Sequence, residues 1–239
     1  PGGGILFTPE FAFPIKWDDI IRPDWVSPGT RIVNQWKLGD ALTGDLDPPI
    51  KSLMVFNANP AVVIADQDKV MTGLAREDLF TVVSEQFLTD TARYADIVLP
   101  ATTQAEQFEL MYSWGQFYLS INEPAIEPIG EAVPNTELFR RLAATFDFDD
   151  AQFQKNDEDM AREAVDWQDP RVAGISFDAL RKKGFARLKL ATPATYTPHA
   201  EGNFGTPSGK CEFRSSLAEE GNLVFSSFRQ GSEEFQPGD

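Results

Sequence analysis

Two polar segments follow short apolar runs, and they are the best candidates for ligand chemistry in this sequence. Asn57-Ala58-Asn59-Pro60 follows the run 52–56, and Ser84-Glu85-Gln86 follows the run 79–83. Asn amides can donate to phosphate oxygens and accept from ribose or base groups. A carboxylate such as Glu85 can accept from a ribose hydroxyl or from the paired donors of a guanine edge. A nucleotide site is one interpretation; a plain turn at 57–60 and a solvated acid at position 85 are the alternatives.

Other catalytic chemistries lack the residues they need. The single Cys (Cys211) and single His (His199) exclude an internal disulfide and any multi-Cys or multi-His metal site within this sequence. Neither GxGxxG nor GxxxxGK[ST] occurs, so the usual NAD loop and the P-loop are both missing. Cys211 falls in an expected strand over 210–214, and we interpret it as a small buried apolar residue.

An acidic region in the middle of the chain is the remaining candidate. Paired carboxylates could act as acid and base or hold a divalent ion. Their spacing fits no known ion loop, so we interpret them as solvated loop acids. They are Glu106, Glu109, Glu123, Glu127 and Glu131.

The elements around the two polar segments predict an α/β fold. Apolar runs predict strands over 52–56, 79–83 and 96–99, with a helix over 66–74 and a helical turn over 89–94. This alternation is typical of a Rossmann-like parallel sheet with helices on both faces. The carboxyl ends of adjacent parallel strands meet at one sheet edge. We therefore expect Asn57, Asn59 and Glu85 to lie together, with Gln86 beside them.

The flanking regions predict irregular N-terminal and C-terminal extensions. Residues 1–49 are rich in Pro and aromatics and predict a coil with short helical turns. Residues 50–189 form the expected α/β domain, and residues 190–239 begin with a linker. Within the α/β domain we expect a loop over 101–134. Helices are predicted over 136–145 (capped by Asn135), 158–167 and 176–183.

The composition narrows the classes of protein further. The sequence has 239 residues, with 21 basic and 37 acidic side chains and a net charge of −16. Such a surface repels the phosphates of nucleic acids. No apolar run approaches the length of a membrane helix, which predicts no membrane insertion.

Three segments together resemble the molybdopterin oxidoreductases of the dimethyl-sulfoxide-reductase family. They read PPIKSLMVFNANPAVVIADQDKV, LFTVVSEQFLTDTARYADIVLPATTQAEQ and TPSGKCEFRS, in that order. The opening PGGG, the segment NEPAIEPIGEA and the helix FRRLA match the same family. The resemblance implies a prokaryotic-type enzyme that carries molybdenum on two molybdopterin guanine dinucleotides. It also implies that this sequence is an internal piece corresponding to the family's third domain, which holds the guanine end of one cofactor. On that resemblance, residues 1–49 would lead from a preceding domain, and residues 190–239 would be a linker and the start of a truncated C-terminal β-barrel domain.

The resemblance assigns site residues position by position. Asn57, Asn59 and Pro60 match the family's Asn-x-Asn-Pro turn near the diphosphate and guanosine of the cofactor. Either Glu85 or Gln86 takes the place of an Asp that grips the guanine.

A threonine-rich pattern after the second strand also matches the family. Thr89, Thr91 and Asp96 fit T-x-T-x-x-x-A-D. For Asp96, a structural cap and a cofactor contact both remain possible interpretations.

The functional expectation is part of a molybdopterin-dependent oxidoreductase, with no catalytic and no metal-ligating residue in this piece. The resemblance implies that an iron–sulfur cluster could lie in a preceding region. Partners would be the remaining domains of the same polypeptide and an electron-transfer subunit. The alternative is a stand-alone nucleotide-binding or structural subunit that packs on a catalytic partner. The cytoplasm is favoured, and a periplasmic location would require an export signal upstream.

Overall fold

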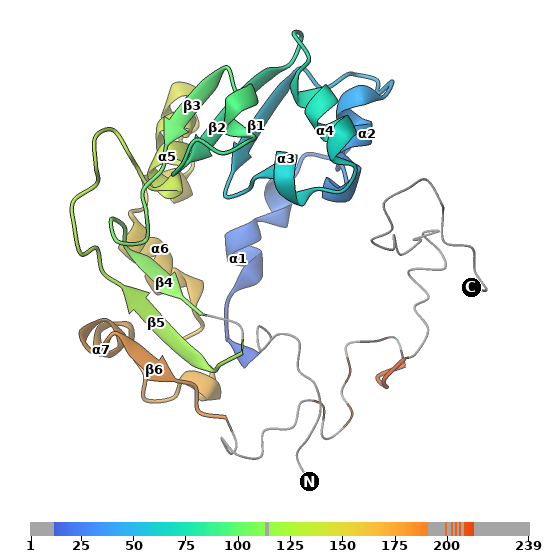
Figure 1. Ribbon diagram of the computed structural model, residues 1–239. Coiled ribbons are helices and arrows are strands. Elements are labelled where there is room, and N and C mark those ends of the chain that lie inside the picture. Colours follow the sequence, from blue (N-terminus) through green and yellow to red (C-terminus); the bar gives the residue numbers. More distant parts are fainter. Residues whose placement is uncertain are drawn as a thin grey trace. The chain divides into compact units, whose positions relative to one another are not determined.

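The computed structural model describes residues 12–112 and 115–190, together with residues 199, 202, 204, 206 and 208–212. The chain divides into two compact units. One spans Phe7–Lys189 and contains every helix and strand named below; the other comprises Pro1–Leu6 and Leu190–Asp239. Figure 1 labels the larger of these elements.

The first half of the larger unit alternates helices with parallel strands. Its elements are α1 (Trp17–Ile21), η2 (Pro23–Trp25), η3 (Gln35–Lys37), α2 (Leu38–Thr43), β1 (Ser52–Phe56), α3 (Pro60–Val63), α4 (Gln67–Leu74), β2 (Phe80–Glu85), η4 (Ala92–Tyr94) and β3 (Ile97–Pro100). The second half contains β4 (Glu109–Met111), β5 (Tyr118–Asn122), α5 (Asn135–Thr145), η5 (Ala151–Gln154), α6 (Asp157–Ala164), η6 (Pro170–Val172), α7 (Phe177–Lys183) and β6 (Phe185–Arg187).

The three predicted strands form a parallel sheet in the order β1-β2-β3. Val55 pairs with Val83, and Val83 pairs with Val98. The predicted α/β fold and its three parallel strands are therefore confirmed, with shifts of one or two residues at the strand ends. The shared register also means that all three strands end at the same edge, as expected for parallel strands.

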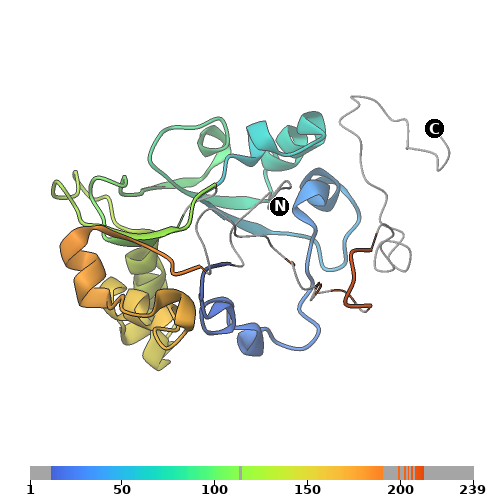
Figure 2. The same cartoon turned by 90° about the horizontal axis from the view of Figure 1, so that it is seen from below.

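Helices lie on both faces of this sheet. Leu53 and Val55 face the side of α4 and η4, where Val70 and Leu74 are buried. On the other face the ring of Phe56 contacts Phe139 of α5, with centroids 4.9 Å apart. Figure 2 shows α4 and α5 on opposite sides of the sheet.

Helix α2 joins the core through a close contact with α4. Leu42 is almost fully buried in the same cluster as Val70 and Leu74. Gly73 permits this approach, because a Cβ at that position would lie only 2.4 Å from Leu42 Cβ. The predicted helical turns within residues 12–49 are thus present, and the last of them packs on the α/β core. Phe7 and Phe11, counted among the aromatics of this region, lie outside the described residues.

A second sheet corrects the loop predicted over 101–134. β4, β5 and β6 form an antiparallel sheet in that order. β5 alternates, with Leu119 and Ile121 buried and their neighbours more exposed. These strands are only three to five residues long. They gain most of their stability from pairing across long sequence separations, which a local pattern does not reveal.

The later helices begin and end close to their predicted limits. Asn156 and Ser176 cap α6 and α7, each accepting a hydrogen bond from a backbone N–H of the first turn. Gly184 ends α7 with φ of 86°. Asn135 is the exception: it is the first residue of α5, not its cap, and its side chain points elsewhere.

The predicted strand over 210–214 is only partly testable. Residues 210–212 are not in a strand, while 213 and 214 lie outside the described residues, as does most of the expected linker and barrel region. Cys211 is exposed, so its interpretation as a buried apolar residue is wrong. No helix in the described part of the chain is long and apolar enough to cross a membrane.

Candidate functional site

A pocket of about 270 Å³ lies at the carboxyl edge of the parallel sheet. Five segments line it, and they come from both halves of the unit. They are Asn57 after β1, Ser84–Gln86 at the end of β2, Ala101–Thr102 after β3, Gln107–Glu109 at the start of β4, and Pro134–Thr136 at the start of α5. The sequence predicts that Asn57, Asn59, Glu85 and Gln86 meet at one sheet edge. Three of them, Asn57, Glu85 and Gln86, line this pocket, whereas Asn59 does not.

The backbone at the pocket is shaped by its polar residues. Asn57 has φ of 52°, in the left-handed region that Asn tolerates better than most residues. Glu85 Oε1 accepts from the N–H of Gln86 at 2.7 Å. Glu85 lines the pocket, and its Oε2 has no hydrogen-bond partner among the described residues.

One polar bridge ties β1, β2 and α5 together. Ser84 Oγ donates to Asn135 Oδ1 at 3.2 Å, and Asn135 Nδ2 donates to Asn57 Oδ1 at 2.8 Å. The bridge spans 78 residues of sequence between Asn57 and Asn135. Sequence reasoning missed this role because Asn135 was interpreted only as a helix cap.

A second polar chain forms the opposite wall. Gln86 Nε2 donates to the carbonyl oxygen of Thr102 at 2.9 Å. Thr102 Oγ1 donates to Gln107 Oε1 at 2.5 Å, and Gln107 Nε2 donates to Glu109 Oε1 at 2.6 Å. Bonded side chains of this kind are held in fixed orientations, which favours selective recognition of a polar ligand.

Thr136 supplies an unsatisfied group at the pocket. Its Oγ1 is buried and has no hydrogen-bond partner, although Thr136 lines the cavity. Buried hydroxyls are normally paired, because leaving one unpaired costs about 1–3 kcal/mol. Because Oγ1 itself is buried, the Thr136 side chain would have to rotate for this hydroxyl to bond to a ligand in the pocket.

Three predicted site residues of the turn after β1 and the loop after β2 do not line this pocket, namely Asn59, Pro60 and Thr89. Asn59 Oδ1 accepts two hydrogen bonds from Thr91, and Pro60 begins α3. Thr89 Oγ1 accepts from the N–H of Ala92 in the loop after β2. Their assignment to the cofactor stays a prediction without support from this pocket.

Asp96 lies at the other end of the sheet. Its Oδ2 accepts from the N–H of Thr81 at 2.7 Å, and its own N–H donates back to the carbonyl oxygen of Thr81 at 2.9 Å. β3 begins one residue later, so Asp96 stands at the amino edge, away from the pocket. This geometry favours the structural alternative for Asp96.

The acidic region does not form one site. Glu106 is buried, which corrects its interpretation as a solvated acid. Its carboxylate accepts from the hydroxyl and N–H of Thr103 and from the N–H of Ile129, and these bonds hold the pKa of Glu106 below its ordinary value. Glu123 pairs instead with Arg181, and Glu109 belongs to the pocket wall.

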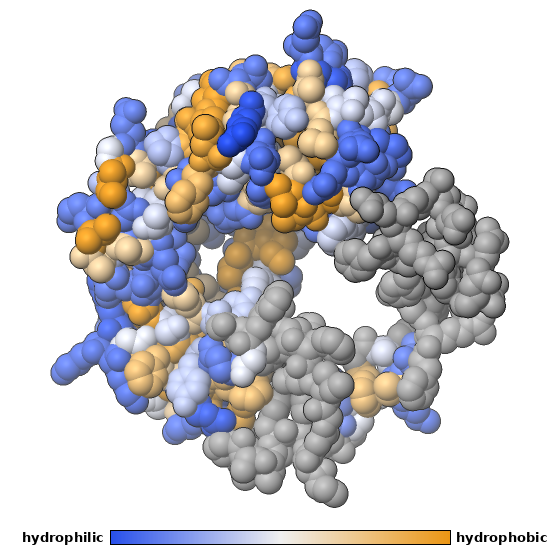
Figure 3. All heavy atoms as spheres, in the orientation of Figure 1, coloured by the Kyte–Doolittle hydropathy of each residue, from blue (hydrophilic) through white to orange (hydrophobic). Residues whose placement is uncertain are grey.

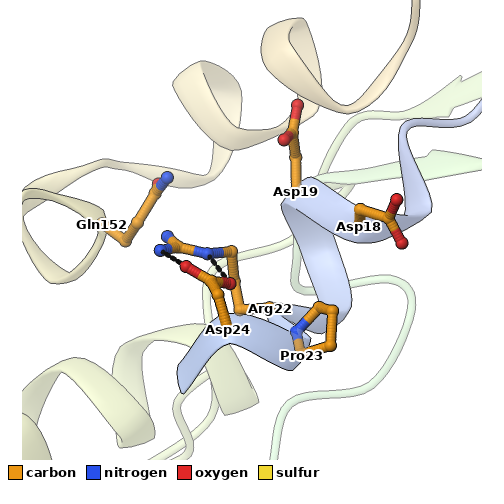
Figure 4. Close-up of a pocket in the computed structure, with 6 residues that line it drawn as sticks. All are labelled: Asp18, Asp19, Arg22, Pro23, Asp24 and Gln152. Carbon is orange, nitrogen blue, oxygen red and sulfur yellow. Dashed lines mark hydrogen bonds and ion pairs between the residues drawn. The ribbon is translucent and has the colours of Figure 1, made fainter. Parts of the chain in front are cut away.

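A second hollow, of about 450 Å³, lies between α1, η2 and η5. Figure 4 shows Arg22 turned onto Asp24, with Asp18, Asp19 and Gln152 around them. The guanidinium of Arg22 makes two hydrogen bonds to Asp24, at 2.9 and 2.6 Å, and lies over the Trp25 ring. Arg22 is therefore already neutralised, and no predicted site residue reaches this hollow.

Comparison with known proteins identifies the family to which this chain belongs. A sequence model of the molybdopterin oxidoreductases matches residues 40–145, which contain β1 to β3 and the pocket walls. The chain belongs to the molybdopterin oxidoreductase family. It is 41% identical over 216 residues to "Probable oxidoreductase YoaE" of Bacillus subtilis, covering 90% of this chain and 31% of that protein. A second B. subtilis protein, "Probable oxidoreductase YyaE", is 30% identical over 177 residues, covering 73% of this chain and 25% of that protein.

A solved structure is similar in fold as well as in sequence. Acetylene hydratase from Pelobacter acetylenicus superposes with a TM-score of 0.59 at 28% identity, covering 79% of this chain and 25% of that chain. This molybdopterin oxidoreductase chain therefore spans a third or less of each relative. The family is an oxidoreductase-class enzyme family whose members use a molybdenum–pterin cofactor. Two of these relatives are named as probable oxidoreductases and one as a hydratase, so family membership does not identify the substrate.

Proposed function

We propose that this chain holds the guanine-nucleotide end of a molybdopterin guanine dinucleotide within a longer molybdenum-dependent oxidoreductase. The observation that carries the proposal is the pocket at the carboxyl edge of β1 and β2, where ligands bind in open parallel sheets. When bound, the cofactor supplies redox chemistry at its metal. The residues described below would bind and orient its nucleotide end.

The groups around the pocket fit a guanine nucleotide. The two carboxylate oxygens of Glu85 can accept from the N1–H and the exocyclic amino group of guanine, since the N–H of Gln86 uses only one acceptor site of Oε1. Gln86 Nε2 donates to Thr102, and Gln86 Oε1 has no hydrogen-bond partner in the described part of the chain. Thr136 Oγ1 is the unpaired hydroxyl that a ribose or phosphate oxygen would satisfy once its side chain rotates.

The amino end of α5 fits the charged part of the ligand. Pro134, Asn135 and Thr136 line the pocket, and α5 runs for 11 residues away from it. A helix N-terminus carries partial positive charge and free N–H groups, both of which stabilise a nearby phosphate. The donors of α5 and the acceptors of β2 would thus bind opposite ends of the nucleotide.

The proposal is tested by cofactor content in the full-length polypeptide. Glu85→Gln removes an acceptor for the guanine edge, and a base-edge pair of this kind is worth roughly 1–3 kcal/mol. We expect cofactor retention to fall by about ten- to a hundredfold. Glu127→Gln is the matched control, because Glu127 is exposed and does not line the pocket. Equal guanine-nucleotide content in both variants would contradict the assignment of Glu85.

Exposed apolar side chains support the proposal that this chain packs against the remaining domains of the same polypeptide. Val62 and Val63 on α3 and Phe87 and Leu88 after β2 are largely exposed, and Figure 3 shows apolar surface over α3 and over β3. Large apolar patches of this kind normally mark contacts. We expect slower amide exchange over 60–63 and 86–88 in the full-length polypeptide than in this chain alone. An electron-transfer subunit, an iron–sulfur cluster and a cytoplasmic location stay predictions.

A further inference from the structure

The bridge from Ser84 through Asn135 to Asn57 has a fixed direction. Ser84 Oγ donates to Asn135 Oδ1, which orients the Asn135 amide so that its Nδ2 donates to Asn57 Oδ1. An amide has one oxygen and one NH₂ group. Because Asn135 donates to its oxygen, the Asn57 amide is held with its NH₂ group turned away from Asn135, where it is available to donate to a ligand.

The position of Asn135 in the fold suits it to hold the Asn57 side chain in one orientation. It is the first residue of α5, where a regular helix fixes its backbone, and its side chain reaches two strand ends of the sheet. Asn57 by contrast stands in a turn with positive φ, and within the described part of the chain Asn135 is its only side-chain hydrogen-bond partner. The orientation of Asn57 therefore depends on the donor that Asn135 supplies.

We propose that Asn135 is a positioning residue that makes Asn57 a hydrogen-bond donor toward the cofactor. This inference rests on the proposed function of the pocket. The chemical class it selects is an acceptor-rich group beside Asn57, such as a phosphate or ribose oxygen. A donor placed at this position would meet the NH₂ group of Asn57 and be rejected.

The test is Asn135→Asp in the full-length polypeptide. Aspartate has nearly the same shape but can no longer donate, so the amide of Asn57 turns its NH₂ group onto residue 135 and presents its oxygen to the pocket. A carboxylate in the first turn of a helix is favourable for the helix itself. A purely structural role for Asn135 thus predicts an unchanged or higher melting temperature and unchanged cofactor content.

The measurement is guanine nucleotide released from the denatured protein as GMP, per polypeptide, together with the melting temperature of the cofactor-free form. We expect Asn135→Asp to lower nucleotide content by about tenfold, the loss expected from one reversed hydrogen bond, without a lower melting temperature. Ser84→Ala, which removes the donor that orients Asn135, should cause a smaller loss. Asn135→Ala is the control for the added charge, because it removes the donor to Asn57 without placing a carboxylate beside the pocket, and it should also lower the content.

The outcomes separate this inference from the proposed function. Wild-type nucleotide content in Asn135→Asp overturns the inference alone. A wild-type polypeptide without guanine nucleotide overturns the proposed function, and the inference with it. A loss in Asn135→Asp combined with wild-type content in Asn135→Ala would show that added negative charge, not the direction of the bridge, lowers the content, and would also overturn the inference.

Discussion

Thr91 donates twice to the side chain of Asn59. Its N–H and its hydroxyl both reach Asn59 Oδ1, at 3.2 and 2.7 Å, and its Oγ1 also accepts from the N–H of Ala61 at 3.0 Å. These bonds fasten the turn after β1 to the loop after β2. The acceptor of Asn59 is therefore used inside the protein, while Asn57, two residues earlier, lines the pocket.

Thr91→Val should destabilise the chain. Thr91 is fully buried, and the substitution leaves the N–H of Ala61 without its partner. The expected loss is about 1–3 kcal/mol in the free energy of unfolding, measured by urea denaturation. Thr91→Ser keeps the hydroxyl, removes only the methyl group and should lose clearly less. Wild-type stability in Thr91→Val would contradict a stabilising role for these hydrogen bonds.

Thr136→Val should separate stability from cofactor binding. Its hydroxyl is buried and unpaired, so the apolar isostere should raise or leave unchanged the melting temperature of the cofactor-free protein. Cofactor content of the full-length polypeptide should fall. Thr81→Val is the matched control, because Thr81 Oγ1 is also buried and unpaired but does not line the pocket. Loss of cofactor in both variants would argue against a contact from Thr136.

Asp96→Ala should reduce stability and leave cofactor content unchanged. The carboxylate caps the N–H of Thr81 at the amino edge of the sheet. Removing one hydrogen bond to a charged acceptor should lower the free energy of unfolding by about 1–2 kcal/mol. A drop in nucleotide content comparable to that of Glu85→Gln would restore the cofactor contact as the better interpretation of Asp96.

Gly73→Ala should force α2 and α4 apart. The new methyl group would lie 2.4 Å from Leu42 Cβ, an atom fixed to the backbone that cannot rotate away. Overpacking of this kind costs about 1–3 kcal/mol. Thr72→Ala, on the exposed side of α4, is the control and should change stability little in a urea titration.

Stability should fall in acid partly through Glu106. Its folded-state pKa is below its ordinary value because Thr103 and Ile129 donate to the carboxylate. A lowered pKa contributes stability that is complete above the unfolded-state pKa of about 4.3 and is lost as pH falls through the folded-state value. Glu106→Gln should flatten the acid side of a plot of melting temperature against pH. An unchanged slope below about pH 4.3 would contradict this role.

Local patterns predicted the elements that carry strong signals of their own. The run 52–56 is apolar and ends at a turn, and Gly184 ends a helix that Ser176 begins. The rule that parallel strands end at one edge then predicted the meeting of Asn57 and Glu85. β4 to β6 were missed because three- to five-residue strands depend on partners distant in sequence.

By itself, the sequence determined the parallel sheet, its family and the polar segments at its carboxyl edge, because each depends on residues close together along the chain. Only the tertiary structure decided which way those side chains turn. Asn59 and Asp96 are engaged by Thr91 and Thr81, whereas Asn57 receives its hydrogen bond from Asn135, 78 residues away. A polar side chain bonds to the partner that the folded chain brings within reach, and that partner can lie far away in sequence.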